Sequence, residues 1–200
     1  MPLHPYLVEN GFTKFEGSLQ QIPKQIEWFG KYVRGAYRPK TILEIGFNAG
    51  HSAEVFLHYS DETHVTSFDL GEHAYVECGK KYIDATFPNR HELILGNSLK
   101  TIPEFILANP GKNFDMIFID GGHDFETAFA DISNCLSLAH SNTLVIMDDT
   151  MYYADGQPAD CGPTNAWIHA ISLGLIKEED NGRIMFDYYR GMSLGKYVFG

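Results

Sequence analysis

Four polar residues that could carry out chemistry together stand at the ends of two apolar runs. One run leads into Asp120, and His123 follows it past two glycines. The other run ends in Asp148 and Asp149. If these runs are neighbouring parallel strands, their carboxylates meet at one edge of the sheet, where three unpaired anions would repel one another. A hard divalent cation removes that repulsion, so we predict that Asp120, Asp148 and Asp149 bind Mg²⁺, or else Mn²⁺ or Ca²⁺.

A glycine turn stands earlier in the chain, within Thr41-Ile-Leu-Glu-Ile-Gly-Phe-Asn-Ala-Gly50-His-Ser. Gly46 can adopt a positive φ and leaves room for a ligand, while Gly50 lets the following helix start close to the sheet. The fingerprint of hydride-transfer enzymes, Gly-x-Gly-x-x-Gly, is missing, because Asn48 takes the place of its middle glycine. An acid, Glu44, precedes the turn instead. This pattern predicts a nucleotide-type cofactor that is cationic and carries no phosphate.

Further polar positions follow two later strand-like runs. Asp69 lies at the end of the run His64-Val-Thr-Ser-Phe-Asp-Leu70, where an acid can accept hydrogen bonds from both ribose hydroxyls of a nucleoside. Asn97 and Ser98 follow the next run and offer amide and hydroxyl groups. The same residue types also suit a helix cap or a plain turn, so the sequence alone leaves both interpretations open for Asn97 and Ser98.

The composition limits the class of protein. With 200 residues, of which 44% are hydrophobic, the chain can bury a sizeable core and fits one α/β domain. A net charge of -11 disfavours nucleic acids and anionic membranes as partners. The three cysteines form no Cys-x-x-Cys pair, which argues against a disulfide framework or a structural zinc site. The N-terminus has no signal-peptide pattern and no apolar run is long enough to span a membrane, so we expect a cytoplasmic protein.

Apolar runs rich in β-forming residues alternate with longer amphipathic runs, which is typical of a parallel sheet covered by helices on both faces. Helices are predicted over residues 18–35, 52–59, 75–87, 102–108, 125–139 and 165–173. Strands are predicted through Leu43 and Ile45, and over residues 64–70, 92–95, 114–119 and 143–147. A final antiparallel hairpin is predicted over residues 184–190 and 195–199, after an irregular stretch, 151–163, that is long enough to be a functional loop.

The segment Glu44-Ile-Gly-Phe-Asn-Ala-Gly-His-Ser52 resembles the first motif of the class I S-adenosylmethionine-dependent methyltransferases, and the order of elements resembles theirs too. The resemblance implies an α/β, Rossmann-like fold with a seven-stranded, mostly parallel sheet and a C-terminal antiparallel hairpin. It also implies S-adenosylmethionine as the cofactor, with Asp69 at the ribose and Asn97 and Ser98 near the adenine. The cofactor-binding residues are then expected to be Glu44, Gly46, Phe47, Asn48, Gly50, Ser52, Asp69, Asn97, Ser98 and Asp120. A single domain, 1–200, would comprise a helical cover (1–38), a cofactor and metal core (39–150), a substrate loop (151–165) and a C-terminal helix and hairpin (166–200).

The metal and base positions resemble those of the metal-dependent sugar O-methyltransferases, including the enzymes that act on macrolide deoxysugars. In that group the histidine three residues after the first metal-binding aspartate acts as general base, and His123 holds the matching position. The resemblance implies a reaction in which Mg²⁺ binds the acceptor hydroxyl of a sugar or glycan. His123 then removes the proton, and the oxygen attacks the methyl carbon in line with the leaving sulfur. The alternative for His123 is a structural role, in which it donates to Asp120 or Asp124.

Other functions fit parts of the same pattern. A catechol or phenol O-methyltransferase would share the fold, cofactor and metal, although catechol-type enzymes typically have a lysine where His123 stands. A nicotinamide-dependent oxidoreductase and a non-catalytic module of a larger glycan-modifying protein are further alternatives, and the chain could form a homo-oligomer. Candidates for the acceptor site are Tyr152, Tyr153 and Asp155. Candidates for a helical cover over the cofactor are Gln20, Gln21 and Trp28.

Overall fold

The computed structural model describes residues 2–17, 22–35 and 37–200. It divides into two compact units, Met1–Asn97 and Ser98–Gly200. The predicted start of the first long helix at residue 18, and the cover residues Gln20 and Gln21, lie outside the described residues. The three cysteines are free thiols, as expected. None of the described helices has the length and apolar content that a bilayer crossing requires.

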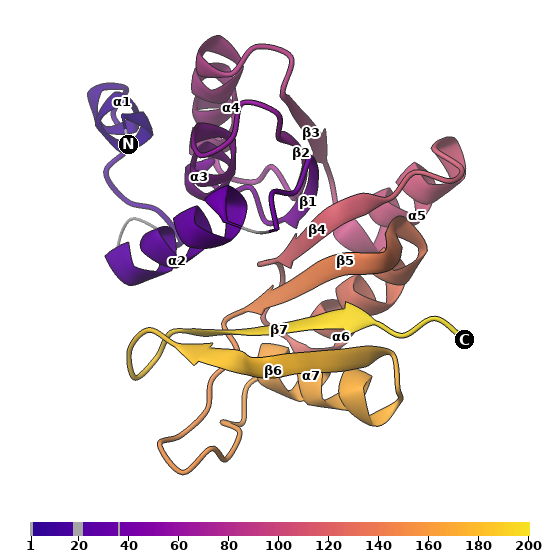
Figure 1. Cartoon of the computed structure of the whole chain (residues 1–200). Helices are drawn as coiled ribbons and strands as arrows, with labels where there is room; N and C mark the ends of the chain where they lie inside the picture. The colour runs from indigo at the N-terminus through magenta and orange to yellow at the C-terminus, as the bar shows by residue number, and fades with distance from the viewer. Residues whose placement is uncertain (1, 18–21, 36) are drawn as a thin grey trace. The chain divides into compact units, whose positions relative to one another are not determined.

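The first unit contains three parallel strands with helices beside them (Figure 1). Its elements are α1 (Leu3–Glu9), α2 (Pro23–Arg34), β1 (Thr41–Ile45), α3 (His51–His58), β2 (His64–Asp69), α4 (Ala74–Thr86) and β3 (His91–Leu95). The hydrogen-bonded order is β3-β2-β1, with both pairings parallel. β1 and β2 are nearly all buried, with Ile42, Leu43 and Phe68 fully inaccessible, as expected for central parallel strands.

The sequence patterns do not predict α1, a helix of seven residues. It is held by its buried side, because Leu3 and Leu7 are fully inaccessible. The backbone N–H of Leu3 donates to Glu54 Oε1 in α3 at 3.0 Å. Tertiary contacts therefore stabilise α1, which is too short to form alone.

In α2 the ring of Trp28 lies 4.0 Å from that of Tyr32 between centroids, so Trp28 takes part in packing within its own helix.

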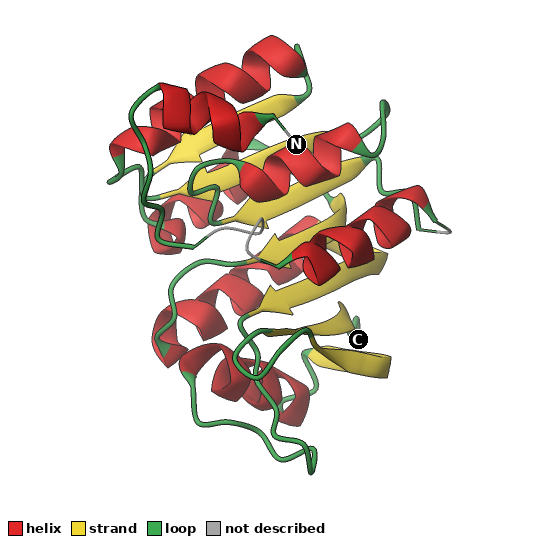
Figure 2. Ribbon diagram, turned by 90° about the vertical axis from the view of Figure 1, so that its left-hand side faces the viewer, coloured by secondary structure: helices red, strands yellow, loops and turns green. Residues whose placement is uncertain are grey.

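The second unit combines two parallel strands with an antiparallel pair (Figure 2). Its elements are α5 (Ser98–Ala108), β4 (Phe114–Ile119), α6 (Phe125–Cys135), a 3-10 helix η2 (Leu136–Leu138), β5 (Ala139–Asp148), α7 (Gly162–Ser172), β6 (Ile176–Met185) and β7 (Gly191–Tyr197). β5 is parallel to β4 and antiparallel to β7, which pairs with β6 at the edge. The seven-stranded, mostly parallel sheet with a C-terminal antiparallel hairpin confirms the predicted fold class.

The predicted boundaries of the C-terminal hairpin are wrong. β6 ends at Met185 and β7 begins at Gly191, so residues 186–190 form the connecting loop, and the predicted turn lies inside β7. Gly191 and Gly195 lie in β7 at positions where neighbouring atoms approach the backbone closely. A Cβ on Gly195 would lie 2.7 Å from Ile176 Cγ2, and a Cβ on Gly191 would lie 2.5 Å from the Thr150 carbonyl oxygen. Small residues are needed inside this strand because its neighbours approach too closely for a side chain.

The turn between β1 and α3 is packed against α4 at Gly79. A Cβ placed on Gly79 would lie 2.2 Å from the carbonyl oxygen of Ala49 and 2.8 Å from its carbonyl carbon. These are backbone atoms, so a short rotation of a side chain cannot relieve the contact. Glycine at this helical position therefore lets α4 lie directly against the turn.

We expect Gly79→Ala to lower the free energy of unfolding by about 1–3 kcal/mol, the range for an overpacked core position. The sign is diagnostic, because alanine stabilises an unconstrained helix interior by roughly 0.5–1 kcal/mol relative to glycine. Urea unfolding would measure the change, with Cys78→Ala in the same helix as the control. A Gly79→Ala protein as stable as the wild type would show that α4 does not depend on this close approach.

Asp131 in α6 is a fully buried carboxylic acid in the second unit. Burial raises its pKa from 3.8 to about 6, the hydroxyl of Ser98 opposes this rise, and the charge of Asp124 adds to it. Because the folded pKa lies above the unfolded value, the folded state holds this proton more tightly. The group therefore costs no stability below about pH 4, and its cost grows as the pH rises toward 6.

Asp131→Asn should accordingly stabilise the protein relative to the wild type by more at pH 7.5 than at pH 4.5. From the size of the pKa shift, the gain in the free energy of unfolding should differ by roughly 2–3 kcal/mol between the two pH values. Denaturant unfolding of wild type and variant at both pH values would measure this difference. Asp61→Asn, which changes an exposed carboxylate, serves as the control. A wild-type and Asp131→Asn difference that does not change with pH would contradict the expected ionisation.

Candidate functional site

The predicted glycine turn lies between β1 and α3 in the first unit. Gly46 and Gly50 have φ values of +95° and +89°, and the amide of Gly46 donates to the Phe68 carbonyl at 2.8 Å. Phe47 is fully buried, and its ring would lie 2.7 Å from a Cβ on Gly50. Ser52, the second residue of α3, is also buried. The turn therefore has the tight backbone that its glycines predict, and it leads directly into the N-terminus of a helix.

Glu44 lies beneath this turn with no accessible surface. One of its oxygens, Oε2, accepts a hydrogen bond of 2.5 Å from the hydroxyl of Ser67 in β2. The other, Oε1, is buried without a hydrogen-bond partner in the described part of the chain. Burial raises the pKa of Glu44 to about 7, and the hydroxyls of Ser52 and Ser67 limit the rise. Because the carboxyl group is inaccessible, Glu44 supports the turn from below.

Asp69 joins the end of β2 to the glycine turn. Its Oδ2 accepts the amide hydrogen of Asn48 at 2.7 Å, and its Oδ1 accepts that of Gly71 at 2.8 Å. Each oxygen keeps a second lone pair for a ligand hydroxyl. Asn48 has a φ of +51°, and its side-chain oxygen is buried without a hydrogen-bond partner among the described residues. Asp69 and Asn48 thus offer unused acceptors, which suit hydroxyl and ammonium donors on a ligand.

Two further predicted cofactor residues, Asn97 and Ser98, are consecutive in the chain where the first unit ends and the second begins. Asn97 is exposed and is the last residue of the first unit. Ser98 is the first residue of α5 in the second unit, and its hydroxyl interacts with Asp131. The sequence left a turn or cap role open for both residues, and Ser98 does begin a helix.

The second unit brings together Asp120, His123 and Asp149. One ligand atom from each of these residues lies within 4.8 Å of the other two. Asp120 follows β4 directly, and Asp149 follows β5, so the two parallel strands deliver both carboxylates to one edge as predicted. Asp148, the last residue of β5, is half-buried and is not a member of this group. The group thus contains two of the three predicted carboxylates together with His123, and the assignment of Asp148 as a third ligand stays a prediction.

Asp149 is paired with two cationic side chains. His123 Nε2 lies 3.0 Å from its Oδ2, and Arg190 Nη1 lies 3.2 Å from its Oδ1. The hydrogen bond to Asp149 raises the pKa of His123, against the effect of partial burial. Burial would raise the pKa of Asp149, but the hydrogen bond from His123 and the charge of Arg190 hold it below its usual value. A protonated imidazole cannot accept a proton, so base chemistry at His123 requires this pairing to loosen.

The stretch predicted as an irregular loop after β5 is folded back on itself. Tyr152 and Pro158 form an antiparallel bridge, and the amide of Tyr153 donates to the Gln157 carbonyl at 2.8 Å. Tyr153 is half-exposed and Asp155 is exposed, so both can meet an acceptor.

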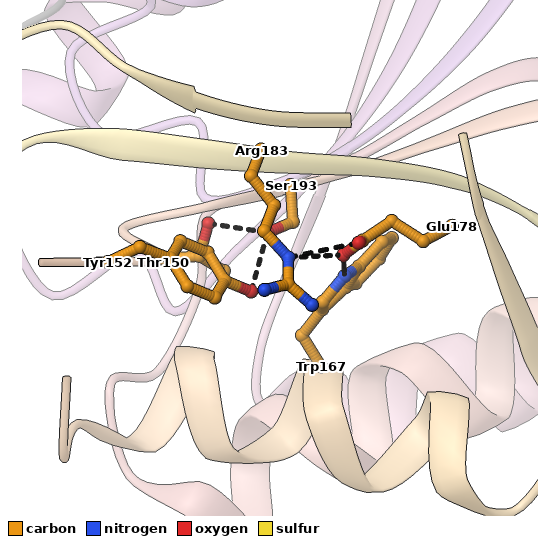
Figure 3. A network of polar contacts seen from close by, with 6 residues as sticks. All are labelled: Thr150, Tyr152, Trp167, Glu178, Arg183 and Ser193. Carbon is orange, nitrogen blue, oxygen red and sulfur yellow. Dashed lines mark hydrogen bonds and ion pairs between the residues drawn. The ribbon is translucent and has the colours of Figure 1, made fainter. Parts of the chain in front are cut away.

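Tyr152, in contrast, is buried in a polar network that Figure 3 shows. Its hydroxyl lies 3.2 Å from Ser193 Oγ, which is also 2.9 Å from Thr150 Oγ1. The guanidinium of Arg183 lies 4.5 Å above its ring. Ser193 therefore ties the start of the loop to β7, and Tyr152 fixes the loop rather than lining a ligand site.

Three functional candidates escaped the sequence interpretation: Ser67, His91 and Arg190. Ser67 and His91 look like ordinary strand residues, and only the register of β1, β2 and β3 brings them toward Glu44. Arg190 stands in a segment that the sequence assigned to a strand, although it lies in the loop before β7. The signal in the sequence that could have pointed to Arg190 was its positive charge in a chain with a net charge of -11.

Comparison with known proteins places the chain in a family. Three similar solved structures each align with 98% of this chain. An O-methyltransferase from Bacillus cereus in complex with S-adenosylhomocysteine (SAH) has 18% identity, 89% of its chain covered and a TM-score of 0.73, and the O-methyltransferase TomG from Streptomyces achromogenes, involved in tomaymycin synthesis and in complex with S-adenosylmethionine (SAM), has 18% identity, 88% of its chain covered and a TM-score of 0.70. A candidate caffeoyl-CoA O-methyltransferase from Staphylococcus aureus has 20% identity, 90% of its chain covered and a TM-score of 0.68. No curated protein sequence matches the chain. The family pattern of the methyltransferase domain matches residues 43–150, more than half of the sequence, so the chain belongs to this methyltransferase family.

Proposed function

We propose that this protein is an S-adenosylmethionine-dependent O-methyltransferase that uses a divalent cation and methylates a hydroxyl group of a sugar or glycan. The observation that carries the proposal is the convergence of Asp120, His123 and Asp149 at the ends of β4 and β5 in a member of the methyltransferase family. The SAH and SAM complexes of the B. cereus enzyme and TomG support the choice of cofactor. We retain the single domain, 1–200, as part of this proposal, since the matched residues belong to both units.

The described residues of the first unit fit S-adenosylmethionine. Asp69 would accept the ribose hydroxyls with the lone pairs that its two amide partners leave unused. The unpaired side-chain oxygen of Asn48 suits a donor such as the ammonium group. The buried Glu44 adds negative potential beneath the turn when it is ionised, which favours a cationic ligand. S-adenosylmethionine supplies a methyl group on a positively charged sulfur, which an acceptor oxygen can take up.

The second unit has ligand atoms that fit a hard divalent cation, although cationic side chains already contact some of them. Asp120 and Asp149 offer carboxylate oxygens, the ligands that Mg²⁺, Mn²⁺ and Ca²⁺ prefer, with Asp148 as the third proposed ligand, and His123 lies beside them as the proposed base. Both oxygens of Asp149 already contact cationic groups, so a metal ion must compete with Arg190 and His123. A bound divalent cation would lower the pKa of an acceptor hydroxyl.

His123 is the group that would take the acceptor proton. Its side chain is more than half exposed, and its Nε2 faces Asp149, so the imidazole lies at the surface beside the carboxylates. Asp149 orients the ring through that contact, as a carboxylate partner commonly does for a catalytic histidine. When Asp149 is engaged by another cation, it favours the imidazolium less, and the neutral base form becomes accessible near neutral pH.

A phenolic acceptor is the second candidate. The similarity to the S. aureus candidate caffeoyl-CoA O-methyltransferase favours it, because that protein shares the fold over 98% of this chain. A methyl-transfer assay with S-adenosylmethionine on a panel of sugars and catechols, with Mg²⁺ or with chelator, distinguishes the two. Chelator-sensitive methylation of sugars supports the proposal. Methylation of catechols alone would replace it with the phenolic function.

His123→Ala should retain affinity for S-adenosylhomocysteine and lose methyl transfer by roughly 10²–10⁴-fold, the usual contribution of a positioned general base. Calorimetry would measure binding, and the acceptor assay would measure turnover. The matched control is His140→Ala, because His140 also pairs with a carboxylate, with its Nε2 3.3 Å from Asp115 Oδ1. Wild-type turnover in His123→Ala would remove this residue from the mechanism.

Asp149→Ala should abolish the response of methyl transfer to added Mg²⁺ or Mn²⁺, because it removes the carboxylate shared by the cluster. Manganese titration of the free protein would show the matching loss of metal binding. Asp180→Ala, at an exposed position of β6, is the control for loss of one negative charge. If metal binds Asp149→Ala as well as the wild type, the metal site must lie elsewhere.

A further inference from the structure

A buried chain of hydrogen bonds crosses all three strands of the first unit. Glu44 in β1 stands directly opposite Ser67 in β2, and the Ser67 hydroxyl lies 2.5 Å from Glu44 Oε2. On its other side the same hydroxyl lies 2.9 Å from His91 Nε2 in β3. The three side chains come from separate strands, so only the folded sheet brings them together.

The inventory of donors fixes the direction of this chain while Glu44 is ionised. Ser67 then donates its one hydroxyl hydrogen to Glu44, so it must accept a hydrogen from His91 Nε2. This assigns the tautomer of His91 from its hydrogen bond. The other ring nitrogen, Nδ1, is buried without a hydrogen-bond partner in the described part of the chain. A buried polar atom left unsatisfied costs free energy, so the position of this imidazole is not explained by stability alone.

The His91 ring also touches the turn itself. It stacks on the ring of Phe47 with 5.0 Å between centroids and an interplanar angle of 28°. Phe47 in turn fills the space beside Gly50, where α3 begins. One imidazole therefore contacts the glycine turn directly through Phe47, and reaches the carboxyl group beneath it through Ser67.

We propose that His91 is a positioning residue for the cofactor: through Ser67 it holds the Glu44 carboxyl group, and through its ring it holds Phe47, so that the glycine turn is preorganised for an adenosyl ligand that carries an ammonium group. This inference rests on the proposed function, because it takes the glycine turn as the cofactor site. His91 touches neither the ligand nor the reacting atoms, and it acts through its two neighbours.

The charged groups around Glu44 define what this arrangement does with pH. Ser52 from α3 and Ser67 from β2 hydrogen-bond its carboxyl group and lower its pKa, while burial and the charge of Asp69 raise it. Burial lowers the pKa of His91 to about 3, Lys80 from α4 adds to this effect, and Asp84 opposes it. His91 is therefore neutral at working pH, and Glu44 is the member of the chain that changes charge near pH 7.

An ammonium group bound at the turn favours the ionised form of Glu44. Affinity for such a ligand should rise with pH up to about 7, the pKa of this group, and then level off. Loss of the Ser67 hydroxyl removes a donor that stabilises the carboxylate, so the pKa of Glu44 rises and the midpoint of the affinity curve moves to higher pH. A purely structural role of the chain would leave this midpoint where it is.

The test is titration of the 200-residue chain and its variants with S-adenosylhomocysteine, followed by calorimetry over pH 5.5 to 8.5. His91→Phe keeps an aromatic ring against Phe47 but removes the N–H donor, and should weaken binding by about 3- to 10-fold, the effect of one buried hydrogen bond. His91→Gln keeps an N–H near the position of Nε2 and should recover most of the loss. Ser67→Ala should weaken binding and shift the pH midpoint upward. His64→Phe, at an exposed position of β2, is the matched control.

Wild-type affinity in His91→Phe, or no recovery in His91→Gln, would overturn the inference while leaving the proposed function in place. An unchanged pH midpoint in Ser67→Ala would overturn it as well. Thermal unfolding of each variant checks that binding is measured on folded protein, and Ser67→Ala decides the question if His91→Phe does not fold. A wild-type protein that binds no S-adenosylhomocysteine at any pH would overturn the proposed function and this inference together.

Discussion

The whole or partial burial of carboxylates near the carboxyl ends of strands is the constraint on which the rest of this structure depends. An ionised carboxyl group taken out of water costs several kcal/mol unless its charge is compensated. The chain meets this cost in three ways. Glu44 is held by a serine hydroxyl, Asp69 accepts two backbone amides, and Asp149 is paired with a histidine and an arginine. The conformations of the turns beside these strands follow from the partners that each carboxylate needs.

The kind of partner decides what each carboxylate can still do. Backbone amides use one lone pair on each oxygen of Asp69, so it suits a ligand that brings hydroxyl donors. Asp149 is compensated by side chains, and both His123 and Arg190 are partly exposed, so another cation could take their place without unfolding of the strand ends. In the proposed function, the first unit would hold its ligand by fixed hydrogen bonds, and the second would exchange one positive charge for another.

The sequence predicts the central strands and the residues at their ends well, because continuous apolar runs such as Phe114–Ile119 read directly as buried parallel strands. It fails where residue type and position conflict. Gly191 and Gly195 look like turn residues but lie inside β7, where Trp167 and Thr150 leave no room for side chains. The sequence did not predict a role for His91, for another reason. Its importance depends on which residues face each other across three strands, and no local pattern encodes that register.

Two residues with a left-handed backbone show how closely geometry and charge are linked. Asn48 and Asp149 have φ values of +51° and +54°, a region that costs non-glycine residues of order 1 kcal/mol, although Asn and Asp tolerate it best. Each stands in a turn that follows a strand, and each is held by a charge-assisted hydrogen bond: the Asn48 amide donates to Asp69, and His123 donates to the Asp149 carboxylate. The bond from the Asn48 amide to Asp69 is worth roughly 1.5–3 kcal/mol, enough to outweigh the strain at Asn48, whereas the more exposed His123 contact contributes less at Asp149. The same contacts that hold these backbones also orient the groups that would meet ligand and metal, so a change at Asp69 or His123 alters the shape of its turn as well as its charge.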